Sequence, residues 1–342
     1  MTPQEIADIS ENIEQIYSQM TDDLLLNIAK HLNSSTWTWT ALGEIETLET
    51  MGQLTEENIR IINEYVQKIP PAVKEAMNES RLQALSEIEE KLAQAALNGH
   101  LTTPVSDGTI EIMEAYVRQA LDHLNLVNQT MLNTSLEQYR KGLDTMRQGM
   151  TTINDEDELS LAQKYIDTAT GQTIIGSETR ASALRKALIE LNASGITGFY
   201  DKLGRSWSAE AYVNMDIRTT VHNTYIQSIR TRQEDYGSDV FQVSAHAGAR
   251  PLCYPYQGKM YSWGSSGGYI TLGDGKKYRF ESIKTTSYGQ PAGLFGINCG
   301  HVPYPMIPAV SEPVDEKIPP KAENDREYEE SQRQRELERR IR

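Results

Sequence analysis

The chain has 342 residues, enough for two or three domains with hydrophobic cores. Hydrophobic residues make up 38% and charged residues 24%, a balance typical of a soluble protein with many exposed helical surfaces. The net charge is −15, and no run of about 18 apolar residues occurs, which excludes a transmembrane helix and argues against a membrane partner.

Apolar residues spaced three and four apart predict a series of helices over residues 1–150. The first stripe consists of Ile6, Ile9, Ile13, Ile16, Met20 and Leu24. A second helix should run from Ile59 to Ile69 and stop at Pro70-Pro71, because proline has no amide donor and clashes with the preceding turn. A third stripe is formed by Ala84, Ile88, Leu92 and Ala95, with a break near Gly99.

The longest stripe continues from Met113 to Met146. A helix of about forty residues would be on the order of 60 Å long, more than a small core requires. It suits an elongated bundle within the chain, or a helix face used for self-assembly or for a protein partner. Residues 1–100 hold 17 acidic and 6 basic side chains, a net charge of −11, so residues 1–150 are predicted to form an acidic helical bundle.

Residues 151–205 are predicted to form a helical connector. It begins with a polar hinge over 151–158, and helical segments follow around 159–168 and 178–191, ending at Gly195. Residues 206–310 should then form a small α+β domain. Its first element is a helix from Ser208 to Tyr236 that Gly237 terminates, and its strands are expected over 240–243 and in a hairpin over 269–280.

Residues 311–342 read as a linker followed by a charged helix from Glu323 to Arg342. Five of the last ten residues are arginines that alternate with Gln and Glu, which favours a solvated helix over a nucleic-acid-binding arm. Because this tail has little apolar surface, we expect it to become helical only on a partner. The predicted fold is therefore mainly α, with a small Cys/His-containing α+β domain before the charged tail.

Scarce ligand-type side chains gather between residues 244 and 305. Both cysteines and two of the six histidines lie there, namely His246, Cys253, Cys299 and His301. Thiolate and imidazole are the preferred ligands of tetrahedral zinc, so a structural zinc site is one interpretation. The others are buried thiols with hydrogen-bonded histidines, and a Cys253–Cys299 disulfide. The start of the chain, Met1–Glu5, lacks the basic and apolar regions of a signal peptide, so we expect a reducing cytoplasm and a disulfide only after release from the cell.

Two short motifs in the same segment suggest binding residues. Arg250-Pro251 and Gln257-Gly258-Lys259 could contact a phosphate or a substrate, although Arg250 is more simply explained as a donor to loop carbonyls. His222 is interpreted as an ordinary residue of a polar helix face. Neither His-Glu-x-x-His nor Gly-x-Ser-x-Gly, two common hydrolase signatures, is present.

These blocks follow one another in a fixed order: His246-Ala-Gly-Ala-Arg-Pro251, then Gln257-Gly-Lys259, then Gly293-Leu-Phe-Gly-Ile-Asn-Cys-Gly-His301. Together they resemble the C-terminal signature of phage minor capsid proteins related to the minor head protein F of phage Mu. The resemblance covers roughly residues 210–342 and includes Asn298 among the binding or structural residues. Relatives often have His in place of Cys253, which favours a shared metal, and usually Arg in place of Gly300.

The resemblance implies a structural, non-enzymatic head-morphogenesis protein in the virion. It would be present in few copies at the portal vertex and inner capsid, after assembly in the host cytoplasm, and would be able to leave the head with the DNA. Its partners would be portal and capsid proteins. Residues 244–310, with a net charge of +4, would make at most weak contacts with packaged DNA. The alternatives are a virion-carried metal-dependent hydrolase, an ADP-ribosyl transferase-like effector, and a cytoplasmic assembly adaptor.

Overall fold

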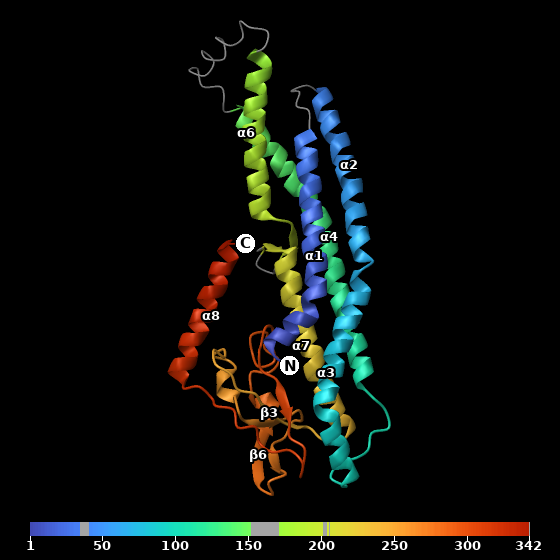
Figure 1. The fold of residues 1–342 in the computed structure, drawn as a ribbon, viewed down its shortest axis with the longest axis vertical. Coiled ribbons are helices and arrows are strands. Elements are labelled where there is room, and N and C mark those ends of the chain that lie inside the picture. The colour runs from blue at the N-terminus through green and yellow to red at the C-terminus, as the bar shows by residue number, and fades with distance from the viewer. Residues whose placement is uncertain (35–40, 152–170, 201–203, 205, 342) are drawn as a thin grey trace. The chain divides into compact units, whose positions relative to one another are not determined.

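The computed structural model describes residues 1–34, 41–151, 171–200, 204 and 206–341, and it is mainly helical (Figure 1). The helices are α1 (Pro3–Ser34), α2 (Ala41–Val66), α3 (Ile69–Leu97), α4 (Thr109–Thr151), α6 (Gly171–Ser194), α7 (Ala209–Asp235) and α8 (Lys321–Ile341). The strands are β1 (Thr197–Tyr200), β2 (Ser206–Ser208), β3 (Val240–Val243), β4 (Met260–Ser262), β5 (Gly268–Thr271), β6 (Lys277–Ser282) and β7 (Pro303–Pro305). Two short 3-10 helices lie at Tyr254–Tyr256 and Ile283–Thr285.

Contacts divide the chain into two compact units, and each combines segments that are far apart in sequence. Unit 1 comprises Met1–Glu11, Ala72–Ala120 and Met215–Arg342. Unit 2 comprises Asn12–Pro71 and Leu121–Asn214. The four consecutive regions predicted from the sequence, with boundaries at residues 150, 205 and 310, stay a prediction. The units themselves cannot be separated by cutting the chain once.

Unit 2 is a helical bundle in which segments of α1, α2 and α4 run side by side (Figure 1). A buried chain of hydrogen bonds joins the three helices: Asn27 donates to Asn58 at 2.9 Å, and Asn58 donates to Ser135 at 2.9 Å. Buried polar groups must be paired, so this layer favours one register of the three helices over others. These helix segments therefore pack within the chain, as the first interpretation of the long stripe expected.

The predicted apolar stripes are buried. All six residues of the first stripe, from Ile6 to Leu24, are at most 9% exposed. Helix α4 has 43 residues and is about 65 Å long at about 1.5 Å per residue, with Met113, Ala120, Leu124 and Met146 buried.

The prediction for the second helix is wrong at its end. Helix α2 stops at Val66, and Pro70 and Pro71 lie in the first turn of α3 instead of ending a helix at Ile69. Proline is tolerated in a first turn because the amides there have no partner within the helix.

The core of unit 1 lies between two helices and a sheet. Ala84, Ile88 and Leu92 of α3 pack with Tyr225 and Ile229 of α7 and with aromatic residues of the sheet region: Phe241, Tyr261, Trp263 and Phe295. The sheet has the order β5-β6-β4-β3-β7, and only the β4–β6 pair is parallel. The predicted strand at 240–243 and the antiparallel hairpin of β5 and β6 are both present.

Gly237 terminates α7 as predicted. Its φ is +76°, its N–H donates to the Glu234 carbonyl at 2.9 Å, and the next N–H, that of Ser238, donates to Gln233 at 2.8 Å. Glycine takes this left-handed conformation without a Cβ penalty. The chain can therefore leave α7 and enter β3, which begins the sheet.

The predicted hinge at 151–158 and helix at 159–168 lie almost wholly outside the described residues. Helix α6 includes the predicted helix at 178–191, and Gly195 follows it with a φ of +60°. None of the helices that the structure describes has both the length and the apolar character needed to cross a membrane.

The charged tail is helical within the single chain, whereas the sequence predicted a helix only on a partner. Asn324, in the first turn of α8, is fully buried. Its side chain accepts a hydrogen bond from the Ala249 N–H and donates one to the Ala249 carbonyl, each at 2.8 Å. One buried side chain thus docks a helix that has little apolar surface.

We expect Asn324→Ala to release the start of α8. Loss of both bonds to Ala249 leaves a buried amide and a carbonyl unpaired, which costs about 1–3 kcal/mol each. Amide hydrogen exchange over residues 321–331 should become faster. Asp325→Ala is the control, because it removes only the exposed ion pair with Lys321. Equal exchange in the two variants would contradict the docking role of Asn324.

Candidate Cys/His site

Two Gly-rich loops of unit 1 carry the predicted site residues. The first loop follows β3, and its turn is closed by the Cys253 N–H, which donates to the Arg250 carbonyl at 2.8 Å. The second precedes β7, and its turn is closed by the Cys299 N–H, which donates to the Gly296 carbonyl at 2.9 Å. A Cβ at Gly296 would lie 2.5 Å from the Pro291 oxygen, so this close approach of two main-chain segments requires glycine.

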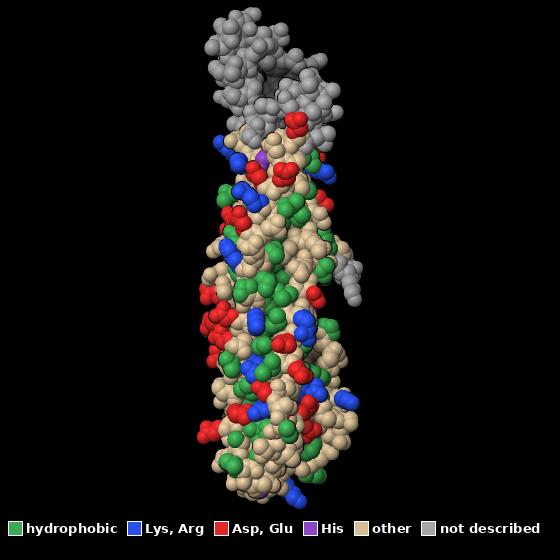
Figure 2. All heavy atoms as spheres, turned by 90° about the vertical axis from the view of Figure 1, so that its right-hand side faces the viewer, with side chains coloured by type: hydrophobic (Ala, Val, Ile, Leu, Met, Phe, Trp, Pro, Cys, Tyr) green, Lys and Arg blue, Asp and Glu red, His purple; other side chains and the backbone are tan. Residues whose placement is uncertain are grey.

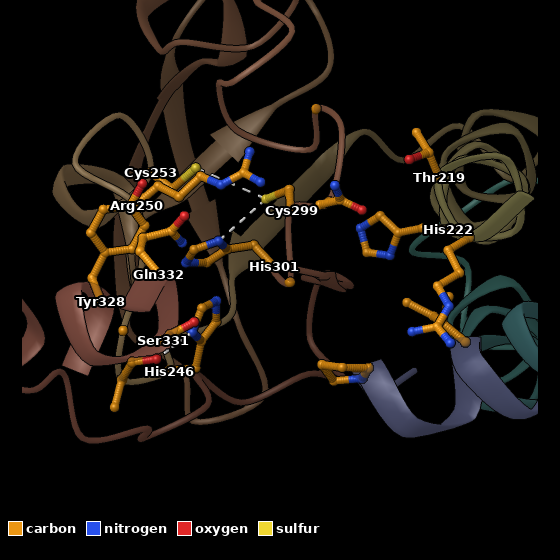
Figure 3. A pocket seen from close by; sticks show the side chains of 18 residues that line it. Thr219, His222, His246, Arg250, Cys253, Cys299, His301, Tyr328, Ser331 and Gln332 are labelled. Carbon is orange, nitrogen blue, oxygen red and sulfur yellow. Dashed lines mark hydrogen bonds between the residues drawn. The ribbon is translucent and has the colours of Figure 1, made fainter. Parts of the chain in front are cut away.

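Three of the four predicted ligands converge. The Cys253 and Cys299 sulfurs are 4.0 Å apart, and the Cys299 sulfur is 3.4 Å from Nδ1 of His301 (Figure 3). The donor atoms of all three residues lie within 4.8 Å of one another, and all three side chains are buried. Two sulfurs and one imidazole nitrogen are suitable ligands for a metal ion such as zinc.

The Cys299 sulfur has the environment of a thiolate. It accepts a hydrogen bond from the Phe295 N–H at 3.2 Å. The Cys253 thiol, together with His301, holds the pKa of Cys299 well below its usual range, although burial opposes the shift. The same pairing with Cys299, together with burial, raises the pKa of Cys253.

His246 lies beside these residues but does not join their donor group. Its ring packs on the ring of His301, with centroids 4.2 Å apart, and its Nδ1 is 2.9 Å from the Ala247 carbonyl. Its main-chain N–H donates to Oε1 of the buried Gln257 at 2.7 Å, so Gln257 positions the loop. Burial and the neighbouring His301 lower the pKa of His246.

Of the remaining predicted residues, Arg250 and Asn298 line the same pocket as the two cysteines, whereas Lys259 does not. Arg250 donates to the Ile297 carbonyl at 2.7 Å and so ties the two loops, which is the contact with a loop carbonyl expected for it. Asn298 is exposed and has a φ of +52°, in the left-handed region that asparagine tolerates. Lys259 is exposed in a different surface depression, with Tyr278 and Arg279.

The interpretation of His222 as an ordinary polar-face residue is wrong. The side chain is only 4% exposed and projects from α7 toward the loop that carries Cys299 (Figure 3). The main chain of His301 faces its ring, but neither ring nitrogen has a hydrogen-bond partner among the described residues. A signal was present in the sequence: Ile226 lies one turn further on the same face, and an apolar residue there indicates that this face is covered.

A pocket of about 300 Å³ opens between α7 and the two loops. It is lined by the Cys/His residues, by Arg218 and Arg250, and by Tyr328, Ser331 and Gln332 of α8. The first turn of α1 contributes Pro3 and Ile6. The site is therefore assembled from the N-terminal helix, α7, both loops and the tail helix.

Comparisons with known proteins find similarity to phage structural proteins. A model of the family described as "Phage minor capsid protein 2" matches residues 1–342. A "Structural protein" of Lactococcus phage LL-H is 27% identical over 270 residues, which cover 78% of this chain and 66% of that protein. The matched region thus spans just under two thirds of that relative. No solved structure matches the chain.

His222 should make the stability of the protein depend on pH. Burial lowers its pKa in the folded chain, whereas an unfolded imidazole titrates near about 6.5. Below that pH the unfolded chain binds more protons, so the free energy of unfolding falls on acidification, by up to about 1.4 kcal/mol per pH unit. Chemical denaturation between pH 7 and 5 should show a smaller decrease in the free energy of unfolding for His222→Phe than for the wild type. The exposed His100→Phe serves as the control, and parallel curves for all three proteins would contradict the prediction.

Proposed function

The chain belongs to the phage minor capsid protein 2 family, and from this premise we propose that it is a structural head-morphogenesis protein of a tailed phage. The match over residues 1–342 carries the proposal, and the phage structural protein that is 27% identical supports it. We place the protein at the portal vertex and the inner face of the capsid, in few copies, after assembly in the host cytoplasm.

Charge supports an assignment of surfaces to partners. Residues 1–100 have a net charge of −11 and would repel a DNA backbone, so we assign their helices to contacts with portal and capsid proteins. Acidic, basic and hydrophobic side chains are interspersed on the face in Figure 2, a mixture typical of protein contacts and of solvated surface. Residues 244–310, with a net charge of +4, are assigned to the side that faces the packaged genome.

Mass spectrometry of purified particles tests the location. We expect the chain in mature particles at a low, fixed ratio to the portal protein, and we expect it to copurify with coexpressed portal after nuclease treatment. If the chain is delivered with the DNA, it should be absent from particles that have released their DNA in vitro. Absence from particles would favour the cytoplasmic adaptor, and loss of portal binding after nuclease treatment would show that DNA had joined the two proteins.

We further propose that Cys253, Cys299 and His301 hold a structural zinc ion. The chemistry of the donor set and the N–H bond from Phe295 to the Cys299 sulfur support a thiolate metal site. His246, the fourth residue of the predicted set, would have to bring a ring nitrogen closer to complete a four-ligand site, because it lies outside the group of donor atoms within 4.8 Å of one another. Bound zinc would close the two loops on each other.

The purified full-length chain should contain about one zinc ion, measured by elemental analysis. Cys299→Ser should lower both the zinc content and the melting temperature, because ligand binding free energy is folding free energy at such a site. His100→Ala, which changes an exposed histidine outside the pocket, should alter neither. A metal-free wild-type chain with the same melting temperature before and after zinc addition would remove this proposal.

A metal-dependent hydrolase is the second candidate, because three protein ligands are typical of catalytic zinc and four of structural zinc. The absorption spectrum of the cobalt-substituted chain separates the two. A spectrum that changes on addition of azide indicates a coordination position open to solvent. A spectrum that changes in His246→Ala but not with azide indicates that His246 is the fourth ligand.

A further inference from the structure

The pocket beside the Cys/His residues has a charge opposite to that of the chain. The chain holds 48 acidic and 33 basic residues, yet the pocket lining includes Arg218 and Arg250 and no aspartate or glutamate. The Cys299 sulfur, whose pKa is lowered, is outnumbered by these two cations, and burial keeps His222 and His246 neutral. The carboxylate of Glu316 interacts electrostatically with His246 but does not line the pocket. It accepts hydrogen bonds from the Ala245 N–H and from the Tyr304 hydroxyl. A lining of this kind attracts anions.

Buried nitrogen atoms around this pocket lack partners. Both ring nitrogens of His222 and the Nε2 atoms of His246 and His301 have no hydrogen-bond partner among the described residues. All three side chains line the pocket. An unpaired buried polar atom costs about 1–3 kcal/mol, so four such atoms at one pocket indicate a polar occupant.

The other polar groups of the lining are rich in donors. Arg250 uses one nitrogen for the Ile297 carbonyl, and a guanidinium has five N–H donors in total. Figure 3 shows Arg250 extending toward the two cysteines, with Tyr328, Ser331 and Gln332 of α8 on the same side of the pocket. Hydroxyl, amide and guanidinium donors together match a ligand that has several acceptor oxygens.

We propose that this pocket binds a phosphate group, either as inorganic phosphate or as a phosphomonoester. Arg250 and Arg218 supply the positive charge, and His222 supplies a ring N–H donor. Nδ1 of His246 donates to the Ala247 carbonyl, so in the neutral ring its Nε2 is an acceptor and contributes no donor. A volume of about 300 Å³ accommodates more than a phosphate ion alone. The ligand would contact α7, both loops and α8 at once. The proposal depends neither on the place of the protein in the virion nor on a bound metal.

Isothermal titration calorimetry of the full-length chain with sodium phosphate, against sodium chloride at equal ionic strength, tests the site. We expect saturable binding of phosphate to the wild type. His222→Phe keeps a ring of similar size without nitrogens and should weaken binding by about tenfold or more, as expected for loss of a hydrogen bond to a charged group. His100→Phe, outside the pocket, should bind as the wild type does.

Several results would overturn the proposal: no saturable binding to the wild type, or equal binding to His222→Phe. Circular dichroism checks that the variants fold, and if His222→Phe does not, Arg250→Gln provides the second test with the same expected loss. The titration is repeated after treatment with a chelator. Binding that disappears with the metal would assign the anion to the metal and not to these side chains.

A further titration distinguishes a phosphate group on a nucleic-acid end from free inorganic phosphate. A 5′-phosphorylated dinucleotide is compared with its unphosphorylated counterpart and with inorganic phosphate. Tighter binding of the phosphorylated dinucleotide assigns the pocket to a nucleic-acid end, and tighter binding of inorganic phosphate assigns it to the free anion. Both results support a phosphate site, whereas equal affinity for the two dinucleotides without binding of phosphate contradicts it.

Discussion

The contacts of the Cys299 sulfur hold together the two loops on which the site depends. The sulfur accepts a hydrogen bond from the Phe295 N–H at 3.2 Å and lies 3.4 Å from Nδ1 of His301. It also lies 4.0 Å from the sulfur of Cys253, which belongs to the other loop. The second loop is also anchored in the core of unit 1 by the buried side chains of Leu294 and Phe295. The Arg250 bond to the Ile297 carbonyl and the Ser287 bond to the Leu252 carbonyl add to this junction.

Helix α7 links this junction to the hydrophobic core. Tyr225 and Ile229 pack with α3 and with the aromatic residues of the sheet region. His222 precedes them by three and seven residues, so it lies on the same face of the helix, where it lines the pocket. A rigid helix that is buried on several sides fixes the position of His222 better than a loop would. The pocket is therefore supported by the core on one side, while the docked helix α8 contributes to its lining through residues that follow Asn324.

Membership of the family does not say what the Cys/His residues bind, but their positions favour some ligands over others. Two buried sulfurs beside an imidazole suit a metal ion under reducing conditions. Under oxidising conditions the same sulfurs, 4.0 Å apart, would have to move closer by about 2 Å to form a disulfide. The basic pocket lies against these sulfurs, in a chain that is otherwise acidic. A ligand in this pocket would stiffen the part of unit 1 where α1, α7, the two loops and α8 meet.

Elements with a local cause could be predicted from the sequence. Spacings of three and four placed the helices, glycine ended α7 at residue 237, and alternating residues with a Gly-Asp-Gly turn placed the hairpin of β5 and β6. The fixed order of the Cys/His blocks also identified the family. Only contacts between distant residues show that unit 1 combines three separate segments and that His222 is buried. They also show that His246 packs against the ring of His301 at a tilt and lies outside the Cys253–Cys299–His301 group. Likewise, only the tertiary structure shows that Asn324 docks the tail. Periodicity reports only which face of an element is apolar, whereas the partner that covers a polar side chain is set by contacts between residues far apart in the chain.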